Sequence, residues 1–372
     1  MRVILERSNL LKSLGHVHRV VERRNTIPIL SNVLLTTEGG NLEMKATDLD
    51  LEMTEAAPAS IEQGGGTTVP AHLLYDIVRK LPDGAEVMLK TDDSGNSMSV
   101  VAGRSTFRLQ CLPQTDFPEL SAGQFSHTFS IQAEDLKLLI NRTQFAISTE
   151  ETRYYLNGIF LHTIEVGSKL MLRAVATDGH RLARAEIEAP SGSEGMPGII
   201  IPRKTVGELQ KLLDEPDVTV QVQLSDTKIR LQIGTVVLTS KLIDGTFPDY
   251  QRVIPTGNDK QLIIDRESFA RAVDRVSTIS SERGRAVKLS IADGQVTLAV
   301  NNPDSGSAIE EIAADYSSDP MEIGFNAKYL LDVAAQLSGS EAKFMLADAG
   351  SPTLIHDTAD EHALYVLMPM RV

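Results

Sequence analysis

The stretch of the chain richest in reactive groups is ATDGHRLA, residues 176–183, where Asp178, His180 and Arg181 lie within four residues. Nucleophilic catalysis would need a serine or cysteine held against the histidine and an acid that orients the imidazole. The sequence contains no nucleophile signature such as GxSxG. A hydrolase or phosphatase that uses these three residues is therefore only an alternative. The simplest interpretation of Asp178-Gly179 is a hairpin turn, because both residue types tolerate a positive φ.

Metal and thiol chemistry are also weakly indicated. The eight histidines are scattered, and Cys111 is the only cysteine, so the sequence supports neither an internal disulfide nor a thiolate metal cluster. His16 and His18 are two residues apart in an expected helix and would point to different faces. We expect no cofactor, no metal and no catalytic residue.

The elements that must position these residues recur three times along the chain. One helical segment repeats the i, i+4, i+7, i+11 spacing of a single helix face. Its three copies are Leu10, Leu14, Val17 and Val21; Leu136, Ile140, Thr143 and Ile147; and Phe269, Val273, Val276 and Ser280. A second helical segment also occurs three times, from Val69, Ile201 and Phe325. Alternating stretches such as LEMKATDLDLEM and VTVQVQLSDTKIRLQI predict strands joined by short hairpins.

The copies are offset by about 125–130 residues, and two of them end alike, in TDFPEL around Phe117 and GTFPDY around Phe247. The polar stretches SAGQ and TGND are typical connectors. We therefore predict an α+β fold of three repeated units, each with two helices packed on antiparallel sheets, over residues 1–123, 124–257 and 258–372. Chance alignment of amphipathic helices is the alternative.

Charge is unevenly divided. The formal net charge is −14, which by itself argues against a phosphate-binding protein. The helical segments 8–24, 70–82, 133–146, 201–215, 265–286 and 326–337 together carry +5, so the remainder carries −19. Helices that face a common axis would then offer DNA a salt-dependent contact indifferent to base sequence, while acidic sheets face outward. An ordinary solvated helix face is the other interpretation of the same charges.

No apolar run approaches the ~20 residues that span a bilayer, and the first residues lack the pattern of a signal peptide. We expect a cytoplasmic protein without a membrane partner.

Several strings together resemble the family of bacterial DNA polymerase III β subunits, the β sliding clamps, over nearly the whole chain. They are IPILSNVLL, ATDLDLEM, RYYLNG, ATDGHRLA, TSKLIDGTFPDY, VNNPD, MEIGFNAKYLLDV and the terminal MPMRV. The resemblance implies the DNA clamp fold and a homodimeric ring around duplex DNA, bound without regard to sequence. It also implies a non-catalytic processivity factor that binds the polymerase III α subunit, the clamp loader δ subunit and other clamp-motif proteins.

The resemblance also implies site residues. The partner peptide-binding cleft would comprise Leu156, Thr177, Gly179, His180, Arg181, Leu182, Pro248, Arg252, Val253, Asn326, Tyr329, Val366, Leu367, Met368, Pro369, Met370 and Arg371. Three arginines of that set, Arg181, Arg252 and Arg371, could hold polar groups of the peptide. Leu367 stands where the family pattern has valine. The DNA-binding residues would be Arg24, Arg153, Tyr154, Tyr155, Arg203 and Lys204, and the dimer interface would use Arg104, Ile279, Glu310 and Glu311.

The first repeat is an internal control for the cleft. At the place of ATDGHRLA it reads ATDLDLEM, without the Gly-His-Arg sequence. The fold therefore does not require Gly179-His180-Arg181 there, which favours a partner site in the second repeat. A third interpretation of the function is an acidic scaffold that binds only proteins. It differs from the clamp interpretation because the scaffold would not form a ring around DNA.

Overall fold

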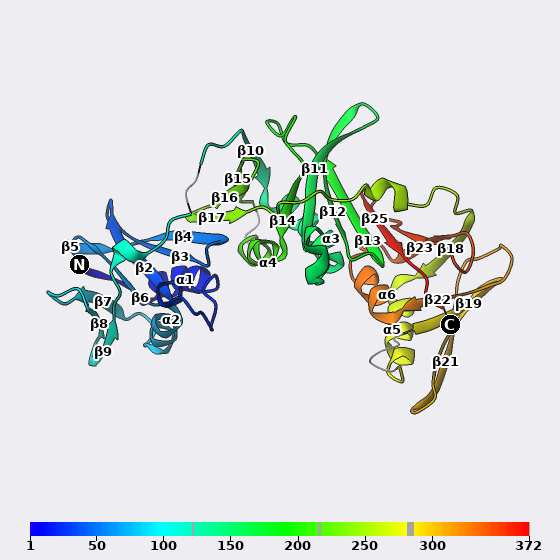
Figure 1. The fold of residues 1–372 in the computed structure, drawn as a ribbon. Helices are drawn as coiled ribbons and strands as arrows, with labels where there is room; N and C mark the ends of the chain where they lie inside the picture. The colour runs from blue at the N-terminus through cyan, green and yellow to red at the C-terminus, as the bar shows by residue number, and fades with distance from the viewer. Residues whose placement is uncertain (121–122, 215–216, 281–285, 372) are drawn as a thin grey trace. The chain divides into compact units, whose positions relative to one another are not determined.

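The computed structural model of the chain describes residues 1–120, 123–214, 217–280 and 286–371. Residues 121–122 of the expected SAGQ connector, and Arg283 and Arg285 of the helical segment 265–286, lie outside the described residues. Within the described residues the α-helices are α1 (Arg7–Val17), α2 (Ala71–Lys80), α3 (Ala133–Thr143), α4 (Arg203–Leu212), α5 (Arg266–Ser277) and α6 (Ala327–Ala334) (Figure 1). The short 3-10 helices are η1 (Pro28–Ser31), η2 (Gln114–Asp116), η3 (Gln144–Ala146), η4 (Glu151–Leu156) and η5 (Tyr250–Val253).

The repeated helical segments are present, but the first of each pair is shorter than its spacing suggested. In α1 the buried face contains Leu10, Leu14 and Val17, as expected, and the helix ends at Val17. Residues 19–21 continue as tight i→i+3 turns, so Val21 is buried outside the α-helix. The fourth position of the spacing in the other two copies, Ile147 and Ser280, also follows the helix end. A 3-10 or turn geometry there tightens the chain and stops the α-helical period.

Unit 1 comprises Met1–Glu134, Pro190–Ser193 and Gly207–Leu242. Its described strands form two antiparallel sheets. The five-stranded sheet has the order β5 (Ser60–Gln63), β1 (Arg2–Glu6), β7 (Glu86–Thr91), β8 (Ser97–Ala102) and β9 (Ser105–Gln110). The eight-stranded sheet has the order β10 (His127–Gln132), β15 (Thr219–Leu224), β16 (Lys228–Ile233), β17 (Val236–Lys241), β4 (Leu51–Pro58), β3 (Asn41–Thr47), β2 (Asn32–Glu38) and β6 (Gly66–Pro70). Helix α1 packs against α2 and against β3 and β4.

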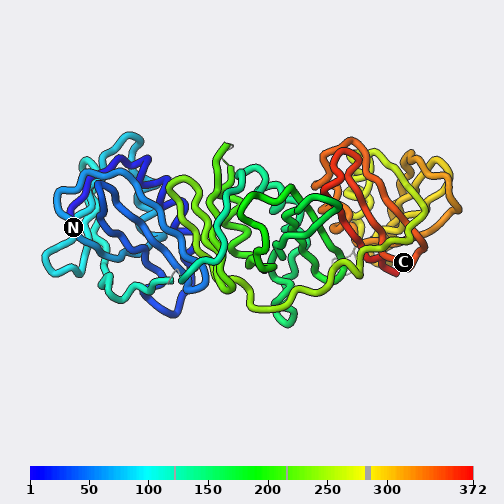
Figure 2. The backbone as a smooth tube through the Cα atoms, turned by 90° about the horizontal axis from the view of Figure 1, so that it is seen from above, coloured from blue at the N-terminus to red at the C-terminus, as the bar shows by residue number. Residues whose placement is uncertain are grey.

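Unit 2 comprises Asp135–Ala189, Glu194–Val206 and Ile243–Val372. Its eight-stranded sheet has the order β14 (Ile199–Pro202), β11 (Gly158–Val166), β12 (Lys169–Thr177), β13 (Arg181–Glu188), β25 (Ala363–Leu367), β24 (Thr353–Asp357), β23 (Glu341–Leu346) and β18 (Lys260–Asp265). A four-stranded sheet has the order β21 (Gly306–Ala313), β20 (Gln295–Asn302), β19 (Ala286–Ala292) and β22 (Met321–Asn326). The C-terminal segment, red in Figure 2, runs beside the strands of residues 341–357.

Each eight-stranded sheet joins strands from two sequence repeats. In unit 1, β4 pairs with β17, with Met53 opposite Leu238. In unit 2, β13 pairs with β25, with Leu182 opposite Val366. Such pairing satisfies the backbone groups that an isolated repeat would leave open at its sheet edge. The division into residues 1–123, 124–257 and 258–372 stays a prediction. The contacts of the folded chain group its residues into the two units described here, each of which joins strands from two repeats.

Strand burial follows the alternation expected for sheets with one face on a core. In β4, for example, every second residue from Leu51 to Ala57 is buried. Helix α1 contributes Leu10 and Leu14, which are fully buried, to the same core. None of the described helices is both long enough and apolar enough to cross a bilayer.

Candidate functional site

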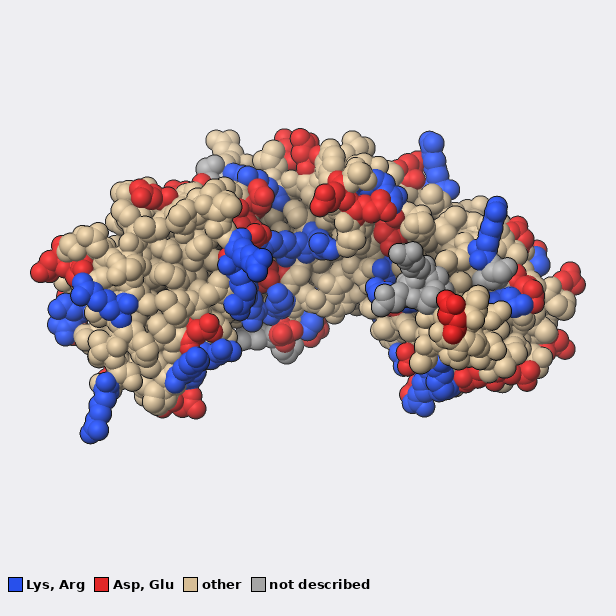
Figure 3. Space-filling view, turned by 60° about the horizontal axis from the view of Figure 1, so that its bottom comes forward, with Lys and Arg blue, Asp and Glu red and all other residues tan. Residues whose placement is uncertain are grey.

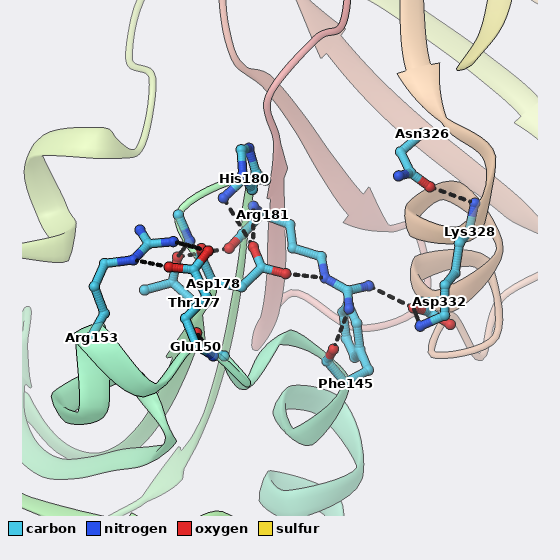
Figure 4. Close-up of polar contacts among 12 residues, drawn as sticks. Phe145, Glu150, Arg153, Thr177, Asp178, His180, Arg181, Asn326, Lys328 and Asp332 are labelled. Carbon is cyan, nitrogen blue, oxygen red and sulfur yellow. Dashed lines mark hydrogen bonds and ion pairs between the residues drawn. The ribbon is translucent and has the colours of Figure 1, made fainter. Parts of the chain in front are cut away.

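The hairpin turn between β12 and β13 in unit 2 is the centre of the site (Figure 4). The Oδ1 atom of Asp178 accepts hydrogen bonds from the backbone N–H groups of His180 at 2.9 Å and Arg181 at 3.0 Å. The hydroxyl of Thr177 donates to the Arg181 carbonyl at 2.7 Å and accepts from the Gly179 N–H at 3.1 Å. The expected turn is therefore present, and its side chains close it. Only Gly179 takes a positive φ, of 91°.

The first repeat builds the same turn from different residues. Thr47 donates to the Leu51 carbonyl at 2.9 Å and accepts from the Leu49 N–H at 3.0 Å. Asp48 accepts from the backbone of Asp50 and Leu51 at 2.9 and 2.7 Å. Leu49, at the position of Gly179, has a φ of 79° although leucine disfavours that region. The turn therefore does not by itself demand glycine.

Close contact with Arg153 distinguishes Gly179 from Leu49. A Cβ atom at residue 179 would lie only 2.4 Å from Nη1 of Arg153. Because glycine has no Cβ atom, the Arg153 guanidinium can lie directly against the turn. Nη2 of Arg153 donates to the Asp178 carbonyl at 2.9 Å, and Nε donates to Glu150 at 2.8 Å. This hydrogen bond from Arg153 lowers the pKa of the Glu150 carboxyl group. Arg153 thus holds η4 against the turn.

The guanidinium of Arg181 is buried, and each of its three nitrogens donates a hydrogen bond. It pairs with Asp178 at 3.0 Å and with Asp332 of α6 at 2.6 Å, and it donates to the Phe145 carbonyl at 2.5 Å. It also lies over the Tyr329 ring, 4.2 Å from the centroid. Arg181 therefore ties the hairpin to α6, and its expected role in holding polar groups of a bound peptide stays a prediction.

A pocket of about 260 Å³ opens beside this hairpin within unit 2. Its lining is mostly apolar, with polar groups at the hairpin. The lining residues are Arg153, Tyr155, Leu156, Thr177, Gly179, His180, Arg181, Leu182, Pro248, Asp249, Tyr250, Val253, Val366 and Met368. We call this the first pocket. Its size and composition suit a small apolar side chain or a short peptide anchor.

The first pocket rests on an ordered core. Leu156, Leu182, Tyr250 and Val366 belong to one buried cluster, and Phe247 stacks on Phe160 with centroids 4.8 Å apart. The segment of residues 243–254 therefore packs across the sheet and forms one wall of the first pocket.

A buried polar network lies at the base of that wall. The Tyr250 hydroxyl accepts from Arg173 at 3.1 Å, and Arg173 pairs with Glu186 at 2.7 Å. Nδ1 of His162 lies 3.2 Å from the Thr163 carbonyl, so it carries the proton, and Nε2 accepts from the Tyr250 hydroxyl at 3.0 Å. Burial lowers the pKa of His162. The neutral imidazole that this network requires is thus also the form that burial favours.

A second pocket of about 400 Å³, also within unit 2, shares His180 and Arg181 with the first pocket. Its lining residues are Ile147, Ser148, Thr149, Glu150, Asp178, His180, Arg181, Asn326, Lys328, Tyr329 and Met370. The Asn326 side chain accepts from the Lys328 N–H at 2.9 Å and caps α6. Burial raises the pKa of the Tyr329 hydroxyl. We call this polar cavity the second pocket.

The C-terminal segment links the hairpin to the four-stranded sheet. The Met368 N–H donates to the His180 carbonyl at 2.9 Å, and the Met370 N–H donates to the Gly324 carbonyl at 2.8 Å. Leu367 is buried opposite Arg181 in the β13–β25 ladder. This backbone path explains why residues so distant in sequence share one site.

The structure brings most of the expected cleft residues together. The first pocket includes Leu156, Thr177, Gly179, His180, Arg181, Leu182, Pro248, Val253, Val366 and Met368. The second pocket adds Asn326, Tyr329 and Met370. Four expected residues line neither pocket: Arg252, Leu367, Pro369 and Arg371. Arg252 is exposed and pairs with Asp249 at 2.8 Å, within the same 3-10 turn.

Sequence reasoning missed Asp249 and Tyr250 as lining residues. The signal was available, because the repeated ending GTFPDY contains both of them. Arg153 and Tyr155, expected at DNA, line the first pocket. Their backbone lies in η4, where Arg153 has a non-helical φ of −108° and ψ of 52°. That kink turns the Arg153 side chain toward the hairpin.

The other expected DNA-binding residues are accessible. Arg24, Arg203 and Lys204 are exposed, and the Tyr154 side chain is 53% exposed. Arg203 and Lys204 begin α4, although the Arg203 N–H already donates to the Asn157 carbonyl at 3.0 Å. Figure 3 shows Lys and Arg side chains gathered in groups on the face that it views.

The expected dimer residues lie at or beside sheet edges. Arg104 is exposed in the turn between β8 and the edge strand β9. Glu310 and Glu311 lie on β21, an edge among the described strands of unit 2. Ile279 follows α5, and its carbonyl accepts from Asn302 at 2.8 Å. Glu310 is paired with Arg275 within the chain, which lowers the pKa of its carboxyl group.

Family models match the chain in three consecutive segments. Residues 1–121, 130–249 and 251–371 match the N-terminal, central and C-terminal domains of the DNA polymerase III beta subunit. The chain is 53% identical over 372 residues to the beta sliding clamp of Caulobacter vibrioides, covering 100% of both chains. It is 41% identical over 375 residues to the beta sliding clamp of Escherichia coli K12, again covering both fully.

Solved structures agree with these matches. A sliding clamp (DNA polymerase III subunit beta) from Bartonella birtlesii, bound to griselimycin, has a TM-score of 0.98 and 63% identity, with 100% of each chain covered. The Caulobacter crescentus pol III beta structure has a TM-score of 0.95 and 53% identity, also with full coverage.

Proposed function

The chain belongs to the family of DNA polymerase III beta subunits, the beta sliding clamps, and from this premise we propose that it encircles duplex DNA as a homodimer. The chain is a processivity factor of DNA polymerase III and not an enzyme. The observation that carries this conclusion is the match of all three family domains, in order, over nearly the whole chain. The expected α+β fold and the expected family are thereby confirmed.

Ring closure is supported by two edge strands that present exposed apolar side chains, which natural sheet edges usually avoid. Strand β9 presents Phe107, 37% exposed, and strand β21 presents Ile309, 76% exposed. Exposed apolar edge strands tend to pair with another chain. Pairing of β9 of one protomer with β21 of its partner would make a heterologous interface, and two such contacts close a ring. Arg104, Ile279, Glu310 and Glu311 are the interface residues of this proposal.

Peptide capture is the second part of the proposed function. The first pocket takes the apolar anchor of a partner's clamp motif, and the second pocket takes its polar flank. The support is the apolar lining with polar groups gathered at one hairpin, and the C-terminal Met368 and Met370, which can repack around different side chains. The partners of this proposal are the polymerase III α subunit, the clamp loader δ subunit and other clamp-motif proteins. The protein would act in the cytoplasm, where the bacterial chromosome is copied.

Topological retention tests the ring. Clamp loaded on nicked circular DNA is expected to stay bound. After the circle is cut once, the clamp should slide off an end of the linear DNA and be released. The readout is co-elution of labelled protein with DNA on gel filtration. Equal retention on circular and linear DNA would mean that the protein binds by surface contact and not by encirclement.

Peptide binding tests the first pocket. Val253 lines the pocket and is 52% exposed, so Val253→Asp should leave the core intact. We expect about a tenfold loss in affinity for a fluorescent peptide that carries the clamp motif of a δ subunit, equivalent to about 1.4 kcal/mol. The matched control is Val166→Asp, because Val166 is 43% exposed in the same unit and lines neither pocket. Equal losses in both variants would refute the assignment.

A further inference from the structure

A row of basic side chains crosses the eight-stranded sheet of unit 2. Arg184 of β13 lies opposite Leu364 of β25, Leu364 lies opposite His356 of β24, and His356 lies opposite Lys343 of β23. Directly opposed residues of an antiparallel sheet point to the same face. Arg184, His356 and Lys343, here called the basic row, therefore share one face around Leu364. All three side chains are half-buried.

The basic row lacks a counter-charge within the part of the chain that the structure describes. Nε of Arg184 is buried and has no hydrogen-bond partner there. Glu186, an acid that acts on Arg184, is already paired with Arg173 at 2.7 Å. Burial lowers the pKa of His356, and Lys343 and Arg184 lower it further, with no acid acting against them. A half-buried cation without a partner is costly, which points to an anion supplied from outside the chain.

The basic row is next to the first pocket on the same face of the sheet. Leu182 and Val366, which line the first pocket, each lie two residues along their strands from Arg184 and Leu364. Two residues along a strand correspond to about 6.8 Å. A segment bound in the first pocket thus needs only a few more residues to reach the basic row.

We propose that the basic row binds the carboxylates of an acidic peptide segment that extends from the motif held in the first pocket. This inference rests on the proposed peptide-binding function of that pocket. It adds a selection among partners, because those with acidic flanking residues bind more tightly than those without them.

The dimensions and charges of the sheet favour a peptide as the occupant. From Arg184 to Lys343 the row spans three strand spacings, about 14 Å, so one small anion cannot contact both ends. An extended peptide places alternate side chains about 6.8 Å apart, so two glutamates can divide the row between them. A nucleic acid carries a phosphate at every nucleotide and would also meet the exposed carboxylates of Glu188 and Glu341, whereas a short peptide can place its two carboxylates on the basic row alone.

The test compares three fluorescent peptides by anisotropy with the full chain. The first peptide carries a clamp motif alone, the second adds a Glu-Ser-Glu extension, and the third adds a Gln-Ser-Gln extension. Each extension is placed at the N-terminus of the motif in one peptide and at its C-terminus in another. We expect the glutamate extension at one end to bind about five- to tenfold more tightly than its glutamine match, as charge-assisted hydrogen bonds would produce. The advantage should vanish in the double variant Arg184→Met with Lys343→Met, while affinity for the motif alone stays unchanged.

Lys169→Met is the matched control. Lys169 is on β12 of the same sheet and pairs with Glu188 at 3.2 Å, so this variant should keep the glutamate advantage. Equal affinity of the glutamate and glutamine peptides for the unmodified chain, or an advantage that survives in the double variant, would overturn the proposal. The proposal would also be overturned if a short single-stranded oligonucleotide, added as a competitor, made the glutamate and glutamine peptides bind equally. That result would favour nucleic acid as the occupant.

Two further measurements separate this inference from the proposed function and from misfolding. If the motif peptide itself fails to bind, a motif-free Glu-Ser-Glu peptide is titrated at millimolar concentration. Weaker binding to the double variant than to the Lys169→Met control then supports the row, and equal binding overturns it. Removal of unpaired cations should leave the urea midpoint of the double variant equal to or above that of the unmodified chain. A lower midpoint would show that the row has a structural partner, which contradicts the proposal.

Discussion

Gly179 and Leu49 occupy the same position in two turns with the same hydrogen bonds, yet their surroundings differ. Leu49 is 39% exposed, with a φ of 79°. Gly179 has a similar φ but lies against the guanidinium of Arg153. Glycine at residue 179 is therefore needed more for the contact between η4 and the hairpin than for the turn itself. That contact shapes the first pocket.

Substitution at the two positions should have opposite effects. Gly179→Ala adds backbone strain and pushes Arg153 from the Asp178 carbonyl, so we expect a loss of about 1–2 kcal/mol in the free energy of unfolding and weaker motif-peptide binding. Leu49→Gly removes strain at an exposed site and should raise stability by up to about 1 kcal/mol. Urea denaturation measures both. A destabilised Leu49→Gly together with a neutral Gly179→Ala would contradict the role given to Arg153.

His162 makes stability depend on pH through the network beneath the first pocket. Because burial holds its pKa below 6.5 in the folded chain, the unfolded chain takes up a proton first as the pH falls. The neutral imidazole therefore contributes stability that is fully present above pH 6.5 and is lost as the pH falls through the folded pKa.

The variant His162→Gln keeps a polar group near the Tyr250 hydroxyl but cannot titrate. Between pH 6.5 and pH 5 its free energy of unfolding should fall less steeply than that of the unmodified chain, by up to about 1.4 kcal/mol per pH unit. Carboxylates, His18 and His356 contribute equally to both proteins, so the difference isolates His162. Identical slopes in urea titrations across this range would disprove the assignment.

At the scale of elements, β9 and β21 are edge strands of their sheets, and each presents an exposed apolar side chain. Most of β9 is exposed, and β21 alternates between exposed and half-buried residues. The ion pair between Arg275 and Glu310 helps to hold β21 against α5. An edge that is ordered in the single chain can pair with a partner without first folding, which lowers the entropic cost of association.

Ile309→Asp should therefore dissociate the dimer. A charge placed in the paired edge is expected to cost about 2 kcal/mol or more, a rise of about thirtyfold in the dimer Kd. Sedimentation equilibrium gives the Kd directly. Ile27→Asp is the control, because Ile27 is 45% exposed but lies outside the sheet edges. A dimer that survives Ile309→Asp with unchanged Kd would exclude β21 from the interface.

At the scale of the whole molecule, the net charge of −14 limits how tightly the protein can bind DNA directly. The excess of 50 acidic over 36 basic residues opposes tight binding to phosphates, so a clamp of this charge must rely on encirclement for long retention. Weak contacts with phosphates then favour sliding, since no single contact holds the duplex in place.

Salt dependence tests which residues contact DNA. The triple variant Arg24→Ala, Arg203→Ala, Lys204→Ala should reduce the slope of log affinity against log salt by up to about 2.7, or about 0.9 per contact. The control triple Lys169→Ala, Lys241→Ala, Arg252→Ala makes the same change in net charge and should alter the slope less. Equal slopes for both triples would favour a nonspecific charge effect and the protein-only scaffold.

Local patterns were sufficient to predict the repeated helices and the hairpin at Asp178-Gly179, whereas the residues of the first pocket were implied by the family resemblance. Periodic apolar positions such as Leu10 and Leu14 report the face of a helix because the helical period is a local property of the backbone. The resemblance to the family then supplied the residues that no local rule identifies, such as Val366 and Met368.

Only the tertiary structure decided how the repeats combine. Whether β13 pairs with β25, and whether Arg181 faces a ligand or Asp332, depends on contacts between residues more than a hundred positions apart. The same holds for Arg153, which closes on Gly179 through a kink in η4. Sequence determined the types of residue that could do chemistry in this protein. Long-range packing decided which donors were used within the fold and which, as in the basic row, were left without a counter-charge.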